Sequence, residues 1–183
     1  MIGLVRSEWV KAFSTKVWWI LLLIGIVLTT LGSLPLLLLT KVAESEDIPE
    51  LDAADPELLR QVWSSMGSAA VIALIIGILG FTGEYRHETI TGTFLTEPRR
   101  GRVVAAKAVV NAIIGVMLAL LSAVTVVLLA LLLLPADHAP IDWGYIASIA
   151  LATMLTYALY AVLGVSVGAL ITNQVAAIVL GLL

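Results

Sequence analysis

The chain has 183 residues, of which 61% are hydrophobic and 13% charged, and it carries a formal net charge of −3 and no cysteine. Because so few charges, gathered in clusters, cannot cover a water-soluble surface, the composition excludes a water-soluble globular protein and indicates an integral membrane protein. The lack of cysteine in the sequence excludes disulfides, thiolate metal sites and cysteine nucleophiles.

Residues 1–16 predict a short amphipathic helix. Apolar side chains recur there at steps of three and four residues, at Ile2, Val5, Trp9 and Phe13. Polar side chains fall elsewhere on the helix, at Arg6, Glu8, Lys11 and Ser14. Such a helix is expected to lie in the membrane interface. The alternative is that this segment simply continues the first membrane span inward.

Charge-free stretches follow, and each meets the roughly 20 apolar residues needed to cross a bilayer. They predict four full transmembrane helices and the start of a fifth, at 17–40, 58–83, 103–135, 143–171 and 175–183. The expected fold class is an all-α integral membrane protein with a single transmembrane domain. Pro35 predicts a kink in the first span. Since a helix that ends in hydrocarbon leaves carbonyls unpaired, we expect a longer natural chain past Leu183.

The charges of the connecting segments predict the orientation. The loop at 41–57 is acidic and ends in a helix start at Asp55 and Pro56. Lysine and arginine concentrate before the first span and in the loop at 84–102, and their excess marks the cytoplasmic side. The sequence therefore predicts a multi-pass protein of the cytoplasmic membrane with its N-terminus inside. The short turns at 136–142 and 172–174 are then outer and inner, respectively.

The segment from Glu84 to Lys107 is the most specific candidate site. Glu84 lies where the second span meets water, and an ionisable group at that depth normally has a partner. The nearest candidates by charge are Arg86, Arg102 and Lys107. An inner basic run follows, consisting of Arg99, Arg100, Arg102 and Lys107.

Between these charges, residues 88–95 can form a short helix that must stop before Pro98, because the residue before a proline avoids the helical region. This helix would present Ile90, Phe94 and Leu95 to an apolar surface outside the membrane. The alternative is a basic loop that only sets topology and contacts anionic lipid headgroups. Charge alone does not separate the two interpretations.

The sequence has no glycine-rich phosphate loop and no zinc-ligand spacing, so it predicts no cofactor, no metal site and no nucleotide chemistry of its own. His87 with Glu84 and Glu88 is interpreted as a hydrogen-bonded loop histidine, since His138 is predicted on the opposite side of the membrane. We expect no nucleic-acid partner.

The fourth span carries a face of polar and small residues, at Thr153, Thr156, Tyr157, Tyr160, Gly164 and Gly168. Such a face suits either a solvated pathway or close helix contact, and the spacing of the two glycines favours contact. Weaker candidates of the same kind lie near the outer end of the second span, at Ser64, Ser65 and Ser68.

Three motifs resemble those of the permeases of the type-2 class of ATP-binding-cassette (ABC) exporters. The first is Glu-Tyr-Arg-His-Glu-Thr-Ile from Glu84, followed by Leu-Thr-Glu-Pro-Arg-Arg and Lys107. The second is the segment from Ala158 to Ile178, and the third is Val-Arg-Ser-Glu-Trp-Val-Lys from Val5. They match the family's first intracellular loop, its fourth-to-fifth span junction and its N-terminal interfacial helix. The resemblance that they carry extends over essentially the whole chain.

The resemblance implies that the loop is a coupling loop that docks on a separate ATPase. Its docking residues would be Glu84, Tyr85, Arg86, His87, Glu88, Thr89, Ile90, Thr93, Phe94 and Leu95. It also implies six spans, of which this chain has four and part of a fifth, a second permease subunit that is identical or different, and cytoplasmic ABC ATPase subunits that bind ATP and Mg. The implied function is export by alternating access across the lipid bilayer.

Two hypotheses from other classes remain. One is a membrane scaffold or sensor without transport, whose basic inner loop recruits a soluble partner or anionic lipid. The other, an intramembrane enzyme, is less supported, because the predicted spans contain no cluster of acids or histidines. The residues do not indicate a substrate.

Overall fold

The computed structural model describes residues 2–46, 56–86, 89–134 and 142–183. Every regular element of these residues is helical, and four segments are long and apolar enough to cross a membrane. These segments are Lys16–Val42, Pro56–Arg86, Arg100–Leu133 and Trp143–Leu170. The expected fold class, an all-α membrane protein, is therefore confirmed.

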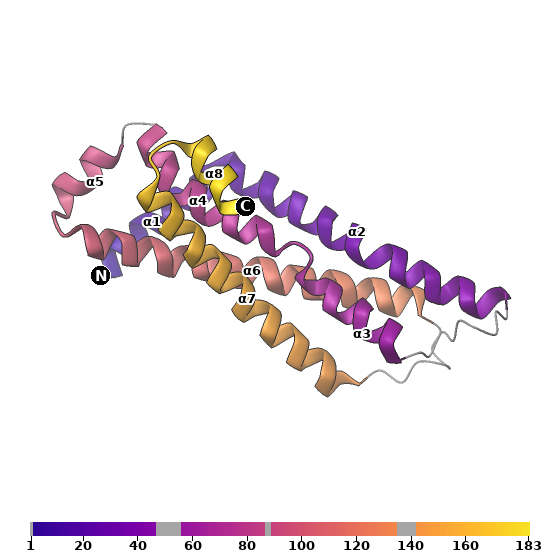
Figure 1. Cartoon of the computed structure of the whole chain (residues 1–183). Coiled ribbons are helices and arrows are strands. Elements are labelled where there is room, and N and C mark those ends of the chain that lie inside the picture. The colour runs from indigo at the N-terminus through magenta and orange to yellow at the C-terminus, as the bar shows by residue number, and fades with distance from the viewer. Residues whose placement is uncertain (1, 47–55, 87–88, 135–141) are drawn as a thin grey trace.

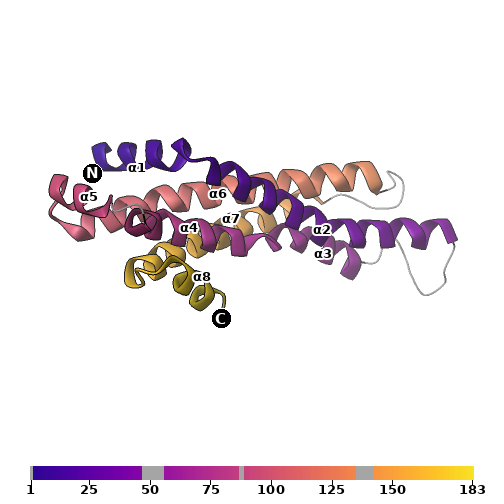
Figure 2. The ribbon, with the colours of Figure 1, turned by 90° about the horizontal axis from the view of Figure 1, so that it is seen from above.

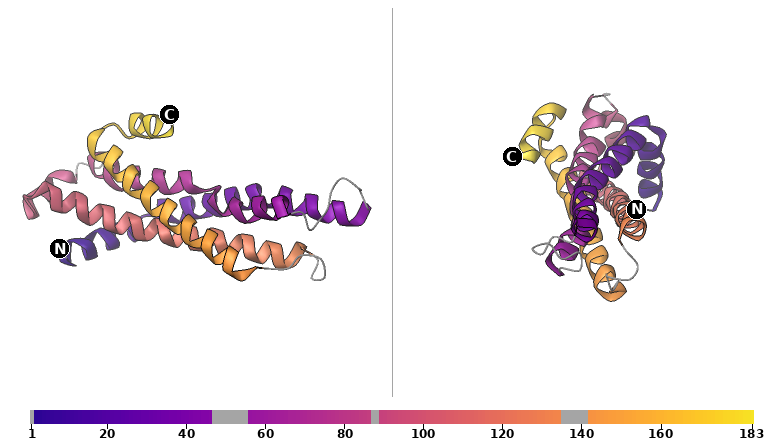
Figure 3. Two further views of the ribbon diagram at one scale, coloured as in Figure 1. Left: turned by 60° about the horizontal axis from the view of Figure 1, so that its bottom comes forward. Right: turned by 90° about the vertical axis from the view of Figure 1, so that its right-hand side faces the viewer.

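The long helices form one elongated bundle (Figures 1 and 2). Helix α4 (Ala70–Arg86) packs against α7 (Trp143–Leu170), and α6 (Arg100–Leu133) packs against both α7 and α2 (Lys16–Glu46). The short helices α1 (Ile2–Ser14), α5 (Ile90–Thr96) and α8 (Gln174–Leu182) gather toward one end of the bundle (Figure 3). We call this the α5 end.

The close approach of α4 and α7 depends on glycines. A Cβ atom on Gly77 would lie 2.1 Å from the carbonyl oxygen of Ala161, and one on Gly164 would lie 2.1 Å from that of Leu74. Because lipid is as apolar as leucine, packing of this kind, rather than exclusion of water, holds membrane helices together. Large apolar side chains are correspondingly exposed along the outer faces, for example Leu31, Leu132, Leu151 and Leu159.

The second span differs from the single helix expected at 58–83. It consists of α3 (Pro56–Ser64), a 3₁₀ turn η1 (Ser65–Gly67) and then α4. The serine and glycine residues of this stretch are weak helix formers, and serine hydroxyls compete for helical carbonyls. The Ser65 hydroxyl donates to the carbonyl of Val62 at 2.6 Å. The span is thus present but interrupted.

The other boundaries follow local signals. Helix α3 begins at Pro56, where a missing N–H costs nothing, while Asp55 lies outside the described residues. Asp142 caps α7 by accepting from two backbone N–H groups, and Asn173 caps α8 in the same way. The first span continues as helix past residue 40, to Glu46.

Candidate functional site: a buried charge cluster beside the α5 helix

Four charged side chains from three helices meet at the α5 end, and we call them the charge cluster: Glu8, Lys11, Glu84 and Lys107. The Lys11 ammonium lies 2.8 Å from Glu8 Oε1 and 2.8 Å from Glu84 Oε1. The Lys107 ammonium lies 2.5 Å from Glu8 Oε2 and 2.8 Å from Glu84 Oε1. Each lysine thus contacts both acids, so the four groups form a closed ring with no net charge.

Three members of the charge cluster are buried. The exposed fraction of the side chain is 2% for Lys107, 6% for Glu8 and 9% for Glu84, whereas it is 46% for Lys11. A charge removed from water must be paired, because its desolvation costs several kcal/mol. The three buried side chains therefore require their ion-pair partners, whereas Lys11 can also be solvated by water.

Helical periodicity presents these groups to one another. Glu8 and Lys11 stand three residues apart on α1 and so share one face. Glu84 lies one turn after Gly80, whose carbonyl also accepts from Lys107 at 3.1 Å. A larger residue than glycine would not fit at position 80, because its Cβ would lie 2.9 Å from Asn111 Nδ2 of α6. The missing Cβ lets α6 come close enough for Lys107 to reach both acids.

The charge cluster also contacts the loop that was expected to dock a partner. Lys11 Nζ donates to Thr93 Oγ1 of α5 at 3.3 Å, and the backbone N–H of Thr89 donates to the carbonyl of Glu84 at 3.0 Å. One lysine of α1 therefore joins α4, α5 and, through the shared acids, α6.

Lys11, like Glu8, lies on α1, outside the membrane-spanning segments. Partial burial lowers the pKa of Lys11, but its hydrogen bonds to Glu8 and Glu84, together with their negative charge, raise it more. The net effect is a pKa above the ordinary value of 10.5. Lys11 is therefore protonated at neutral pH.

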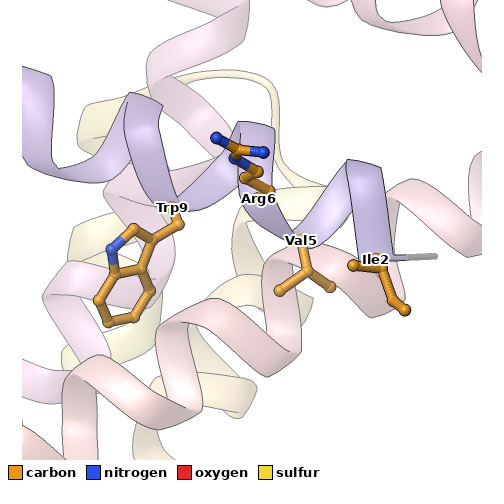
Figure 4. Close-up of a pocket in the computed structure, with 4 residues that line it drawn as sticks. All are labelled: Ile2, Val5, Arg6 and Trp9. Atoms are coloured by element: carbon orange, nitrogen blue, oxygen red, sulfur yellow. The ribbon is translucent and has the colours of Figure 1, made fainter.

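A cavity of about 510 Å³ adjoins the charge cluster. Its walls include apolar side chains of α2, α4 and α6, among them Trp18, Ile76 and Ile114. Two atoms of its lining residues, Trp18 Nε1 and Glu84 Oε2, are buried and have no hydrogen-bond partner among the described residues. A second hollow, of about 350 Å³, lies on α1. Figure 4 shows three apolar residues of its lining, Ile2, Val5 and Trp9, projecting from one side of α1, away from the Arg6 guanidinium.

The expected docking residues of the loop are placed as follows. The Tyr85 ring lies tilted against that of Phe81, with the ring centroids 5.8 Å apart, and Arg86 and Thr89 are exposed. Leu95 of α5 is 78% exposed, whereas Ile90 and Thr93 are half-buried. Phe94 belongs to α5, but its side chain, like His87 and Glu88, lies outside what the structure describes. Helix α5 ends before Glu97, which is extended, as expected of a residue that precedes a proline.

Of the three partners considered for Glu84, the structure selects Lys107. Arg102 lies instead 3.8 Å from Glu97, and Arg99 and Arg100 are exposed. Sequence reasoning missed Glu8 and Lys11, which it assigned to the polar face of the N-terminal helix. The available signal was the lysine at position 107, since a cation two turns inside an apolar helix requires an acid.

The polar face expected on the fourth span is divided. Thr153, Tyr157, Gly164 and Gly168 point into the bundle and are buried, whereas Thr156 and Tyr160 are exposed on the outer surface. A Cβ on Gly168 would lie 2.8 Å from the carbonyl oxygen of Ile78, so both glycines of the expected pair lie against α4. The serines of the second span lie at its break.

The described part of the chain brings together no three histidine, cysteine, aspartate or glutamate side chains that could hold a metal ion.

A comparison with known protein families finds a match. Residues 4–183 match the family model described as ABC-2 family transporter protein. No curated protein and no solved structure matches the chain.

Proposed function

Since this chain belongs to the ABC-2 family of transporter proteins, in which it is a membrane permease component, we propose that it couples ATP hydrolysis in a separate subunit to export. Cytoplasmic ABC ATPase subunits bind ATP and Mg and dock on the loop at 84–102. A second permease subunit completes the pathway, and the two work by alternating access in the cytoplasmic membrane.

The charge cluster is the observation that carries this proposal. A protein docked on α5 would act on a helix that follows α4 directly, contacts Lys11 through Thr93 and precedes α6. Movement of α5 would therefore reach two membrane spans at once, through Glu84 of α4 and Lys107 of α6. A basic loop that only sets topology has no need of a buried ionic connection of this kind.

Alternating access requires contacts that differ between two states, because a ligand shifts an equilibrium only by its differential interaction with the two. Glu84 has a contact that can differ between the two states. Its Oε1 accepts from both lysines, while its buried Oε2 has no partner among the described residues. In the second state we expect this oxygen to gain a donor.

The charges at the two ends of the bundle support an N-terminus on the cytoplasmic side. The basic residues of α1 and of the segment 84–107 lie at the α5 end (Figure 1). The acidic residues Glu57 and Asp142 begin α3 and α7 at the opposite end. An excess of lysine and arginine marks the cytoplasmic side.

The proposal is tested by co-purification of an ATP-hydrolysing subunit with the full chain in lipid nanodiscs. Leu95→Ala removes an apolar side chain that is 78% exposed on α5, so docking should weaken, by about tenfold for one buried leucine. Leu132→Ala is the matched control, because Leu132 is 76% exposed at the far end of α6. Unchanged binding of the ATPase after deletion of residues 88–95 would refute docking through this loop.

A second candidate function is supported by the exposure of Arg99 and Arg100 beside α5. A scaffold or sensor that holds anionic lipid or an acidic soluble partner would use these charges without transport. Its binding would fall with added salt and with each arginine removed, because exposed charges are screened. The absence of any co-purifying ATPase would favour this function.

A further inference from the structure

The break in the second span lies in the middle of the packed bundle (Figure 1). Met66, inside the 3₁₀ turn, and Ala69, just before α4, are both 0% exposed. An interrupted helix frees backbone N–H and C=O groups, and in hydrocarbon these groups must find other partners. The question is which group supplies them.

A single side chain supplies both partners. The hydroxyl of Tyr157 accepts from the backbone N–H of Ala69 at 3.1 Å and donates to the carbonyl of Met66 at 2.9 Å. Tyr157 lies on α7 and is itself 0% exposed. Its hydroxyl therefore bridges the two sides of the break.

Further hydroxyls extend this bridge across the bundle. Ser122 Oγ of α6 lies 3.4 Å from the Tyr157 hydroxyl, and Thr29 Oγ1 of α2 lies 3.0 Å from Ser122 Oγ. All three residues are buried. The break thus lies where α2, α6 and α7 all present buried polar groups.

The two sides of the break belong to different core clusters. Val62, Trp63 and Met66 pack with the far halves of α2 and α6. Ala69, Ile72 and Ile76 instead pack with Trp18, Ile114 and Tyr157. The second span therefore consists of two helical pieces, each packed in its own core, and the five residues from Ser65 to Ala69 join them.

We propose that residues 65–69 form a hinge in the second span and that Tyr157 is the positioning residue that sets its angle. A mid-helix 3₁₀ segment is a common form of hinge. The inner piece, α4, carries Glu84 of the charge cluster and leads into α5. The role of the hinge in transport rests on the proposed function. The hinge itself is inferred from the contacts of Tyr157 with Met66 and Ala69.

The test uses the full chain, which has no cysteine, so that two introduced cysteines take spin labels cleanly. Arg60→Cys places one label on the exposed surface of α3, and Gly83→Cys places the other on α4, where a Cβ has nothing within 4 Å. The two positions are 23 steps apart along the chain, or about 35 Å along a straight helix, a distance that pulsed electron paramagnetic resonance can measure.

Tyr157→Phe keeps the ring and removes the hydroxyl that bridges the break. The conformation described here should then fall in population, relative to a regular helix at 65–69, by at least about thirtyfold, because two buried backbone groups lose their partner. We expect a broader or shifted label-to-label distance in nanodiscs. Tyr160→Phe is the matched control, since Tyr160 lies on the same helix and is 40% exposed. Identical distances in the two folded variants would overturn the hinge.

If Tyr157→Phe does not fold, Gly67→Ala tests the hinge instead. A Cβ on Gly67 has open space, and alanine favours the helix, so this variant should narrow the distance distribution. An unchanged distribution would overturn the proposal.

The distances between the two spin labels are measured with and without the ATPase. Failure of an ATPase to bind would count against the proposed function, while the distances of the chain alone still decide the hinge.

Discussion

The charge cluster and the hydroxyl groups of Tyr157, Ser122 and Thr29 at the break, which we call the bridge, both provide partners for buried polar groups, but with different chemistry. Both place polar groups in the interior of a largely apolar bundle. The charge cluster neutralises two acids with two lysines, whereas the bridge uses uncharged hydroxyls, chiefly that of Tyr157, to satisfy backbone groups. Removing one member of an ion ring leaves an unpaired charge, but removing a hydroxyl leaves only an unpaired dipole. The three buried members of the charge cluster should therefore tolerate substitution less well than the bridge.

Lys107→Met should have the largest effect on stability. It leaves Glu8 and Glu84 buried with only the half-exposed Lys11 between them, and breaking a buried ion pair costs about 3–5 kcal/mol. The measurement is thermal unfolding of the purified chain in nanodiscs. Adding Glu84→Gln to Lys107→Met should recover part of the loss, because it removes the excess negative charge. A double variant less stable than Lys107→Met would contradict the ring of charges.

Tyr157→Phe should have an intermediate effect on the same unfolding measurement. Each of the two backbone groups that it leaves unpaired costs roughly 1–3 kcal/mol, reduced by any shift of the break toward regular helix. Tyr160→Phe should unfold as the unchanged chain does. If Tyr157→Phe proved more destabilising than Lys107→Met, the contrast between charge and dipole would be wrong.

Lys11→Met should have a small effect on stability, below about 1 kcal/mol, since this lysine is half exposed and exposed ion pairs contribute little. It should nevertheless weaken the connection of α1 with α5, because the hydrogen bond to Thr93 is lost. Faster amide hydrogen exchange in α1 and α5, with unchanged exchange in α6, would show this local effect. Equal acceleration in all three helices would contradict it.

The smallest effect is expected from alkaline pH. The pKa of Lys11 is raised above 10.5 in the folded chain, so its contribution is fully present below the unfolded pKa and is lost as pH rises through the folded value. The stability difference between the unchanged chain and Lys11→Met should therefore shrink only above a pH of about 10.5. Comparing the two chains cancels the titration of other groups. Shrinkage already near neutral pH would contradict this assignment.

Much of the candidate site was predictable because its signals are local. An acid at the end of a span predicts a charged partner, for which Arg86, Arg102 and Lys107 are the candidates, and Glu84 pairs with Lys107. Glu8 was not predicted, because periodicity alone placed it on the polar face of α1. At Glu8 that face is covered by α6, whose Lys107 pairs with it, and helical periodicity says nothing about what covers a face.

The sequence by itself determined the class of the protein, since a stretch of about 20 apolar residues crosses a bilayer whatever its neighbours are. It also determined the clustering of basic residues before the first span and after the second, and the start and end signals of several helices. Only the tertiary structure decided which charges pair, because Glu8, Glu84 and Lys107 are remote in sequence and meet through helix packing. It also decided the break in the second span, where the partner of the freed backbone is a hydroxyl some 90 residues away, on α7.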